Sequence, residues 1–184
     1  MSQGVTNERL LFVDISRCMG CRSCEIACAV AHSQSKDLVE AMEEEPRPTS
    51  RVSVEAAEDS AVPLQCRHCE DAPCVTVCVT NALEKLGPNL PVLVKEELCI
   101  GCRFCVMVCP FGVITMGRDG KAALKCDLCI ERLEAGDDPA CVSACPTKAL
   151  RFLPPNEVAA MKRRSTAAAM KDADAKAALV REKA

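Results

Sequence analysis

The stretch "CIGCRFCVMVCP" (residues 99–110) places four cysteines within eleven residues and ends in proline. A C-x2-C pair on a tight turn aims two sulfurs at one metal, and a third cysteine three residues later wraps the chain around the same centre. Zinc sites usually take two pairs separated by roughly a dozen residues, so this spacing favours a [4Fe–4S] cluster. The fourth cysteine, one helical turn onward, points its sulfur elsewhere. The stretch therefore predicts half of a site that another segment must complete.

Three further cysteine runs follow the same plan. Each run has a C-x2-C pair, a third cysteine and a final C-x3-C step, and only the gap before the third cysteine varies. The other runs are "CMGCRSCEIAC" (18–28), "CRHCEDAPCVTVC" (66–78) and "CDLCIERLEAGDDPACVSAC" (126–145). The repeat extends further, because "CVTVCVTNALEKL" (74–86) aligns with "CVSACPTKALRFL" (141–153). The pattern predicts four [4Fe–4S] clusters bound by all sixteen cysteines. The spacing requires the runs to work in pairs without choosing the pairs.

The composition agrees with a fold held by metal. The chain has 184 residues with no Trp, no Tyr and four Phe, so its core lacks the large rings that usually anchor one. No signal peptide opens the chain and no segment is apolar enough to span a membrane, so we expect a cytoplasmic location. In a reducing compartment dense cysteine indicates metal rather than eight disulfides. Four zinc knuckles remain an alternative, because the second and fourth runs alone mimic zinc spacing.

Short strands and helices are expected between the runs. The strands are expected at residues 10–15, 51–56, 62–65, 91–95 and 121–125, with a hairpin turn at 118–120. A surface helix is expected within the acidic stretch 36–50, ended by Pro46 and Pro48. After Pro155, a helix with Asn156 as its N-cap is expected to extend roughly 40 Å.

Other residues near the cysteines are expected to support the clusters without binding iron. His32 and His68 are expected to form hydrogen bonds or to pack rather than to bind metal, because sixteen thiolates already fill the sites. Positive side chains near the clusters are candidates for tuning their potentials; they are Arg22, Arg67, Arg103, Lys125 and Arg132. Gly20 and Gly101 are expected to let backbone amides approach the cluster sulfides. No phosphate-binding or dinucleotide-binding motif and no catalytic constellation is present, so we expect a non-catalytic protein.

The four runs, in this order and with these gaps, resemble the four-cluster ferredoxin-like subunits of molybdenum and tungsten oxidoreductases. The resemblance covers roughly residues 8–153 and is carried by "HCEDAPC" (68–74) and "CDLCIERLEAGDDPACVSACPTKAL" (126–150). Within this group "CEIACAVAHSQSK" (24–36) is most similar to the small subunits that serve tungsten aldehyde oxidoreductase, ranked first, and carbon monoxide dehydrogenase. Val79 departs from the pattern, because many relatives have proline there.

The resemblance implies which runs exchange their last cysteine, namely the first with the fourth and the second with the third. It assigns one cluster to Cys18, Cys21, Cys24 and Cys145, and a second to Cys126, Cys129, Cys141 and Cys28. A third falls to Cys66, Cys69, Cys74 and Cys109, and the fourth to Cys99, Cys102, Cys105 and Cys78.

The expected fold class is α+β, with two ferredoxin-like two-cluster modules of small β-hairpins and short helices and a C-terminal helical arm. One module takes residues 1–34 and 118–153, and the other takes 50–117. An acidic insertion, 35–49, and a helical extension, 154–184, complete the chain.

The expected function is electron transfer between a catalytic molybdenum or tungsten subunit and a second redox partner, such as a flavoprotein or a ferredoxin. Self-association through residues 156–184 would extend the path between protomers. The formal charge of −3 becomes about −11 with four clusters bound, which argues against nucleic acid as a partner. The alternatives are an electron-transfer subunit of carbon monoxide dehydrogenase, formate dehydrogenase or hydrogenase, a free-standing ferredoxin, and a protein that delivers clusters or assembles complexes.

Overall fold

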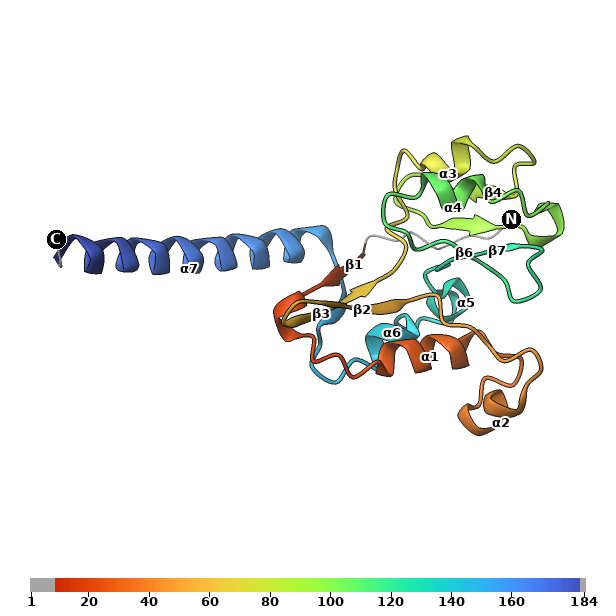
Figure 1. The fold of residues 1–184 in the computed structure, drawn as a ribbon, viewed down its shortest axis with the longest axis horizontal. Helices are drawn as coiled ribbons and strands as arrows, with labels where there is room; N and C mark the ends of the chain where they lie inside the picture. The colour runs from red at the N-terminus through yellow and green to blue at the C-terminus, as the bar shows by residue number, and fades with distance from the viewer. Residues whose placement is uncertain (1–8, 183–184) are drawn as a thin grey trace.

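The computed structural model describes residues 9–182 (Figure 1). The ends of the expected first module and of the C-terminal arm, residues 1–8 and 183–184, lie outside the described residues. Within the described range the chain is α+β, with four two-stranded antiparallel sheets connected by short helices. No helix in this range combines the length and the apolar character that crossing a membrane requires.

Three of the sheets are hairpins of consecutive strands. They pair β2 (Ser53–Ala57) with β3 (Ser60–Leu64), β4 (Leu83–Lys85) with β5 (Val92–Val94), and β6 (Thr115–Met116) with β7 (Ala123–Leu124). The turn expected at 118–120 lies between β6 and β7, where Gly120 N donates to Gly117 O at 2.8 Å. β4 follows the second cysteine run and lies within the repeated segment 74–86.

The fourth sheet joins distant parts of the chain. β1 (Leu10–Val13) pairs with β8 (Leu150–Leu153), with Leu10 opposite Leu153 and Val13 opposite Leu150. Beyond β1, Asp14 N donates to Ala149 O at 2.8 Å. This pairing places the segment before the first cysteine run beside the segment after the fourth run.

Short helices carry the third cysteine of each run. In all four runs the third cysteine lies in the first turn of a helix: α1 (Ser23–Ala31), α3 (Pro73–Thr76), α4 (Phe104–Val108) and α6 (Ala140–Ser143). α1 packs against α6 and α3 packs against α4. The 3-10 turns η1 (Ile15–Arg17) and η2 (Glu96–Leu98) lead into the first and third runs, and α5 (Ile130–Glu134) fills the long gap of the fourth.

Two separate buried cores result from this packing. The α1–α6 core gathers Val54, Leu150 and Phe152 with cysteines of the first and fourth runs. The α3–α4 core gathers Leu83, Val92 and Ile114 with cysteines of the second and third runs. In Figure 1 the α3–α4 core lies above and the α1–α6 core below.

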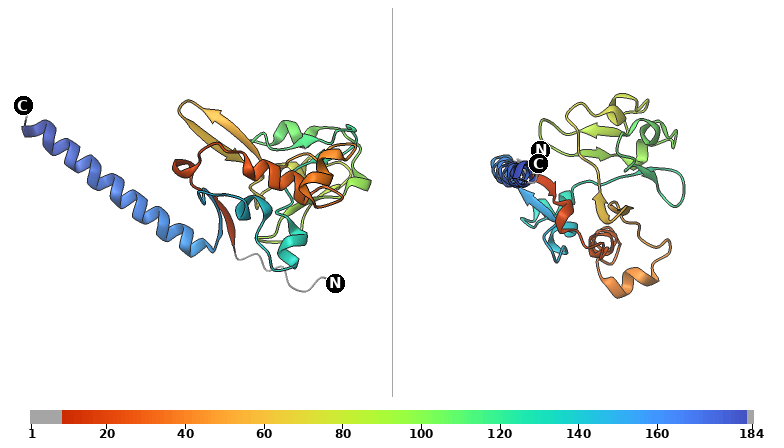
Figure 2. Two further views of the ribbon diagram at one scale, coloured as in Figure 1. Left: turned by 90° about the horizontal axis from the view of Figure 1, so that it is seen from below. Right: turned by 60° about the vertical axis from the view of Figure 1, so that its left-hand side comes forward.

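Two helices lie outside these cores. α2 (Leu38–Glu43) lies in the acidic insertion, begins after the N-cap Asp37 and ends before Pro46, as expected. α7 (Pro155–Glu182) projects away from the rest of the protein in Figure 1 and in the left view of Figure 2. The prediction of Asn156 as the N-cap of α7 is wrong. Val158 N donates to Pro154 O at 3.2 Å, so the helix begins at Pro155, where the missing proline N–H is not needed.

Four of the expected strands are shorter in the structure. β1 ends at Val13 rather than at residue 15, and β5 covers only Val92–Val94 of the expected 91–95. β2 begins at Ser53 because the N–H of Arg51 donates instead to Cys28 Sγ at 3.2 Å. β7 covers only Ala123–Leu124 of the expected 121–125, and the side chain of the next residue, Lys125, is buried. At the start of β2 and the end of β7 the strand gives way to residues that approach the cysteines.

Candidate metal centres

The same tight turn occurs in all four C-x2-C pairs. The residue directly before the second cysteine has a positive φ in every run. These residues are Gly20 (70°), His68 (48°), Gly101 (68°) and Leu128 (64°). Side chains with a Cβ adopt this conformation at a cost of roughly 1–2 kcal/mol, yet two of the four positions are not glycine. The repetition of an unfavourable turn indicates that it serves the site rather than the stability of the chain.

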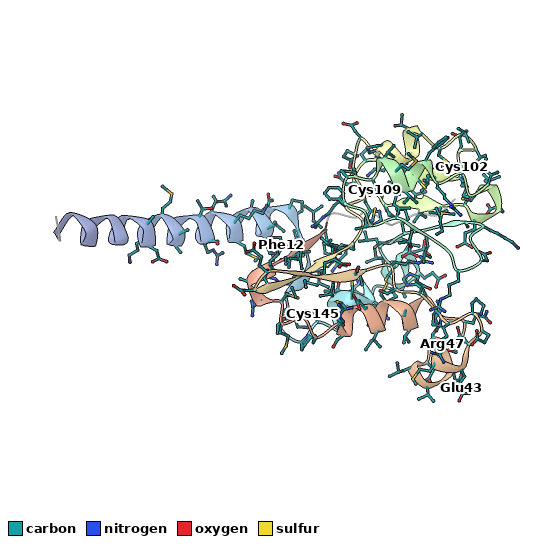
Figure 3. The ribbon with its side chains drawn as sticks, viewed as in Figure 1. Phe12, Glu43, Arg47, Cys102, Cys109 and Cys145 are labelled. Carbon is teal, nitrogen blue, oxygen red and sulfur yellow. The ribbon has the colours of Figure 1, made fainter. Side chains whose placement is uncertain are left out.

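The first and fourth runs meet in the α1–α6 core. Cys24, Cys28, Cys141 and Cys145 are buried there together, and Cys18 packs against them. The second and third runs meet in the α3–α4 core, where Cys74 and Cys105 are buried. The cysteines packed against these two are Cys69, Cys78, Cys99 and Cys109. Figure 3 shows Cys102 and Cys109 in the upper part of the molecule and Cys145 in the lower part.

Finer groupings appear within each core. Cys78, at the end of the second run, lines one cavity with three cysteines of the third run, which are Cys99, Cys102 and Cys105. In the other core, burial raises the pKa of the Cys141 thiol, and negative charge on Cys126, Cys129 and Cys28 raises it further. Thiols from two different runs therefore lie within electrostatic reach of one another.

Two further thiols show similar neighbourhoods. Burial raises the pKa of Cys24 to about 11, the N–H of Glu25 opposes the rise, and negative charge on Glu25 and Cys145 adds to it. Burial also raises the pKa of Cys74, to which Cys66 and Cys109 add. In each case a cysteine from one run faces the last cysteine of another run.

Backbone N–H groups point at several of the sulfurs. Leu83 N donates to Cys78 Sγ and Ala123 N to Cys99 Sγ, both at 3.4 Å. Leu128 N donates to Cys126 Sγ at 3.3 Å, and His68 N to Cys66 Sγ at 3.4 Å. N–H donors stabilise a thiolate more than a thiol, and hydrogen bonds to sulfur are among the features that set cluster potentials.

The donor set fits iron–sulfur clusters. All sixteen cysteines are free, and many are buried beside other cysteines. Burial raises the pKa of several of these thiols, including Cys129 and Cys141, whereas hydrogen bonds outweigh burial and lower the pKa of Cys28, Cys78 and Cys145. A bound metal stabilises the thiolate form at all of these positions. Thiolates in this number, with amides directed at them, are the ligands that [4Fe–4S] clusters use.

A polar network surrounds Cys28. The Asp127 carboxylate accepts from Arg51 Nη1 at 2.6 Å and from Cys129 N at 2.9 Å, and it lies 3.0 Å from His32 Nε2. Burial by itself lowers the pKa of His32, but hydrogen bonds to Asp127 and Cys28 raise it to about 9. Burial by itself raises the pKa of Asp127, but His32 and Arg51 hold it below its ordinary value. The network connects α1, the segment before β2 and the fourth run.

Sequence reasoning identified part of this network. His32 was expected to form hydrogen bonds, and it does so. Asp127 and Arg51 were missed. The position of Asp127 inside the pair "CDLC" was a usable signal, because the other three pairs contain no acidic residue between their cysteines. Nothing local marks Arg51.

The positively charged residues that were candidates for tuning cluster potentials differ in their surroundings. Arg22, Arg67 and Arg103 are exposed, whereas Lys125 is buried at 3% exposure. Arg132 is half-buried and donates from Nε to Asp138 O at 2.9 Å. His68 Nδ1 accepts from Val92 N at 3.0 Å, so this histidine also forms a hydrogen bond as expected.

Comparison with known proteins gives a consistent result. The family model described as a 4Fe-4S dicluster domain matches residues 58–154, more than half of the chain. An "iron-sulfur protein" of Rhodospirillum rubrum is 42% identical over 78% of this chain and 81% of its own. A putative electron transport protein, YsaA, of Escherichia coli is 41% identical over 79% of this chain and 89% of its own. The thiosulfate reductase electron transfer subunit PhsB of Salmonella typhi is 39% identical over 80% of this chain and 77% of its own.

Proposed function

Because the chain belongs to the family of 4Fe-4S dicluster domain proteins, we propose that it carries electrons through four [4Fe–4S] clusters between a catalytic oxidoreductase subunit and a second redox partner. Relatives are named as electron transport proteins or electron transfer subunits, and the chain is a non-catalytic electron-transfer protein of this kind. The single observation that carries the proposal is the meeting of cysteine runs in two cores, because the last cysteine of a run of this spacing ligates a different cluster from its first three, so each site needs a sulfur from another run.

We assign the ligands by exchange between runs. Two sets join the first and fourth runs, namely Cys18, Cys21, Cys24 with Cys145, and Cys126, Cys129, Cys141 with Cys28. Two sets join the second and third runs, namely Cys66, Cys69, Cys74 with Cys109, and Cys99, Cys102, Cys105 with Cys78. The cavity lined by Cys78 and the third run supports the last set, and the mutual effects of Cys28, Cys126, Cys129 and Cys141 support the second.

The two pairs of runs correspond to two ferredoxin-like modules, residues 1–34 with 118–153 and residues 50–117. The pairing of β1 with β8 supports the first module, which is discontinuous in sequence. The β4–β5 hairpin and the packing of α3 on α4 support the second. The insertion 35–49 and the arm 154–184 lie outside these modules.

Each bound cluster accepts and releases one electron at a time. Cys21 and Cys102 are exposed, whereas Cys129 and Cys141 are buried. This difference supports entry and exit of electrons near the first and third runs, with the clusters of buried cysteines between them.

The catalytic partner that we favour is a tungsten aldehyde oxidoreductase, on the strength of the segment 24–36. Electron-transfer subunits of other molybdenum or tungsten enzymes, carbon monoxide dehydrogenases, formate dehydrogenases or hydrogenases are the alternative. The name of PhsB supports membership in an oxidoreductase complex. Co-purification of the tagged chain at its natural expression level, followed by identification of the large subunit, decides among them. We place the complex in the cytoplasm, where the second partner would be a flavoprotein or a ferredoxin.

Self-association through residues 156–184 is a separate part of the proposal. α7 spans 28 residues, and its side chains from Lys162 to Lys171 are exposed. Deletion of residues 156–184 should therefore reduce the assembly state in light scattering without changing the iron content. An unchanged assembly state would refute this part alone.

Iron content and magnetic resonance test the core of the proposal. Protein purified without oxygen should be brown, contain about sixteen irons and become EPR-active on reduction. A colourless, EPR-silent zinc protein would contradict it. Rapid transfer of its clusters to an apo-enzyme would instead favour a role in cluster delivery.

A further inference from the structure

Lys125 lies at the junction of the two cores. Within residues 9–173 it is the one buried residue with a charged side chain, at 3% exposure. Its Nζ donates to Cys126 O at 2.6 Å, at the start of the fourth run, and to Val92 O in β5. The ammonium group of Lys125 therefore forms hydrogen bonds to the backbone of both the α1–α6 half and the α3–α4 half of the protein.

The positive charge of Lys125 has no carboxylate partner among the described residues. The carboxylate nearest in sequence, Asp127, pairs with Arg51 at 2.6 Å and with His32 at 3.0 Å. Two carbonyl oxygens satisfy two of the three N–H donors but carry no full negative charge. A buried charge without a counter-ion is strongly unfavourable, so the loaded protein must supply an anion near this group.

Both carbonyl oxygens that bind Lys125 lie beside cysteines. Cys126 opens the fourth run, so its carbonyl oxygen belongs to a residue that we assign as a cluster ligand. Val92 is buried in the α3–α4 core with Cys74, and its N–H donates to His68 Nδ1 at 3.0 Å, inside the turn of the second run. Cys126 belongs to the fourth run and Cys74 to the second, so the two contacts represent the two halves.

We propose that Lys125 is the shared counter-cation of two clusters, the one that contains Cys126 and the one that contains Cys74, and that it raises the reduction potentials of both. This inference rests on the proposed function, because it takes the cluster assignments from there. Lys125 acts as a positioning residue through its charge and touches no reacting atom.

The physical reason is a competition between burial and charge. One added electron changes the net charge of a tetrathiolate cluster from about −2 to about −3, and no bond forms or breaks. The electron comes from a neighbouring reduced cluster, which is oxidised in turn. Burial disfavours the more charged state, and Cys129 and Cys141 are buried whereas Cys21 and Cys102 are exposed. Without a cation, the inner clusters would accept electrons less readily than the outer ones and would hinder passage between the halves. Lys125 offsets this difference.

The test compares three variants of the full-length protein loaded with clusters. Lys125→Met removes the charge and keeps the length of the side chain, whereas Lys125→Arg keeps the charge. Lys85→Met is the matched control. Lys85 Nζ also bonds a backbone carbonyl beside these sites, His68 O at 2.9 Å, but its charge is paired with Glu70 at 3.4 Å. Redox titration followed by EPR gives the potential of each one-electron step, and iron analysis gives the cluster content.

Lys125→Met should lower the reduction potentials of two of the four one-electron steps. The expected decrease is at least about 59 mV, which corresponds to a tenfold shift of the equilibrium towards the oxidised form. Lys125→Arg and Lys85→Met should shift every step by less than about threefold. Full iron content in Lys125→Met without a tenfold shift would overturn the inference. If Lys125→Met loses iron, then a Lys125→Arg variant with full iron content and wild-type potentials supports the proposed role of the positive charge. Iron loss in both would assign Lys125 to packing and overturn the inference. Absence of iron from the wild-type protein would instead refute the proposed function.

Discussion

The two halves of the molecule use one cysteine plan but hold their runs together differently. Among the described residues, the α1–α6 core contains eleven buried residues, including Phe152, and the α3–α4 core contains seven. The α1–α6 half also has the network of Asp127, His32 and Arg51 around Cys28. At the corresponding place in the other half, Cys109 is followed by Pro110 and the exposed Phe111, and the described ion pairs include none beside it.

Chain connectivity explains this difference. In the α1–α6 half Leu10 pairs with Leu153, 143 residues apart, whereas in the α3–α4 half Leu83 pairs with Val94, 11 residues apart. The entropy of closing the longer loop is greater by about 2 kcal/mol. The additional ion pairs and the larger core offset that cost. Each metal-binding turn is therefore a local structure. Joining turns that are far apart in the sequence requires additional contacts, which the α3–α4 half, with its shorter loop, does not need.

The largest expected effect follows from removing the exchanged cysteines. Cys28→Ala should lose the cluster that we assign to the fourth run, and Cys109→Ala the one assigned to the second, each about four of about sixteen irons. Iron and sulfide analysis of double variants identifies the cluster. Adding Cys126→Ala to Cys28→Ala should remove no further iron, because both belong to one set, whereas adding Cys18→Ala should remove a second cluster. The reverse pattern would refute the exchange between runs.

The next effect concerns the network found only in the α1–α6 half. Asp127→Ala leaves the partly buried Arg51 and His32 without their carboxylate, and should lower the free energy of unfolding by about 3 kcal/mol. Denaturant unfolding of the loaded protein measures this change. Glu84→Ala is the control in the α3–α4 half, because it breaks an ion pair to Lys95 whose partners are both 46% exposed. Water screens that pair, so its loss should change stability far less. Equal effects would contradict the difference between the halves.

The smallest expected effect compares equivalent glycines. Alanine at either position adopts an unfavourable positive φ. At Gly101 a Cβ would also lie 3.0 Å from the backbone oxygen of Lys121, whereas at Gly20 it would meet the side chain of Ala61 at 3.3 Å. Gly101→Ala should therefore destabilise by about 2 kcal/mol and Gly20→Ala by about 1 kcal/mol, measured by thermal unfolding. A larger effect at Gly20 would show that backbone crowding does not distinguish the two turns.

Much of the local structure could be predicted from spacing and composition. The α+β class, the short strands, the turn near Asp119 and the acidic surface helix follow from residue patterns a few positions long. Gly20 and Gly101, singled out because they would let backbone amides approach the cluster sulfides, lie at two of the four left-handed turns. The other two, at His68 and Leu128, are visible only from the repeat, because neither residue favours a positive φ by itself.

The sequence by itself determined the chemistry of the binding turns, because two sulfurs three residues apart on a tight turn are a local matter. The order of the cysteine runs and the gaps within them also indicated the iron–sulfur family. Only the tertiary structure separated Lys125 from four exposed or half-buried cations, and only it brought Arg51 to Cys28 and Asp127 to Arg51. Those two contacts join residues 23 and 76 positions apart, and a local pattern carries no information about which distant side chain will be buried beside it.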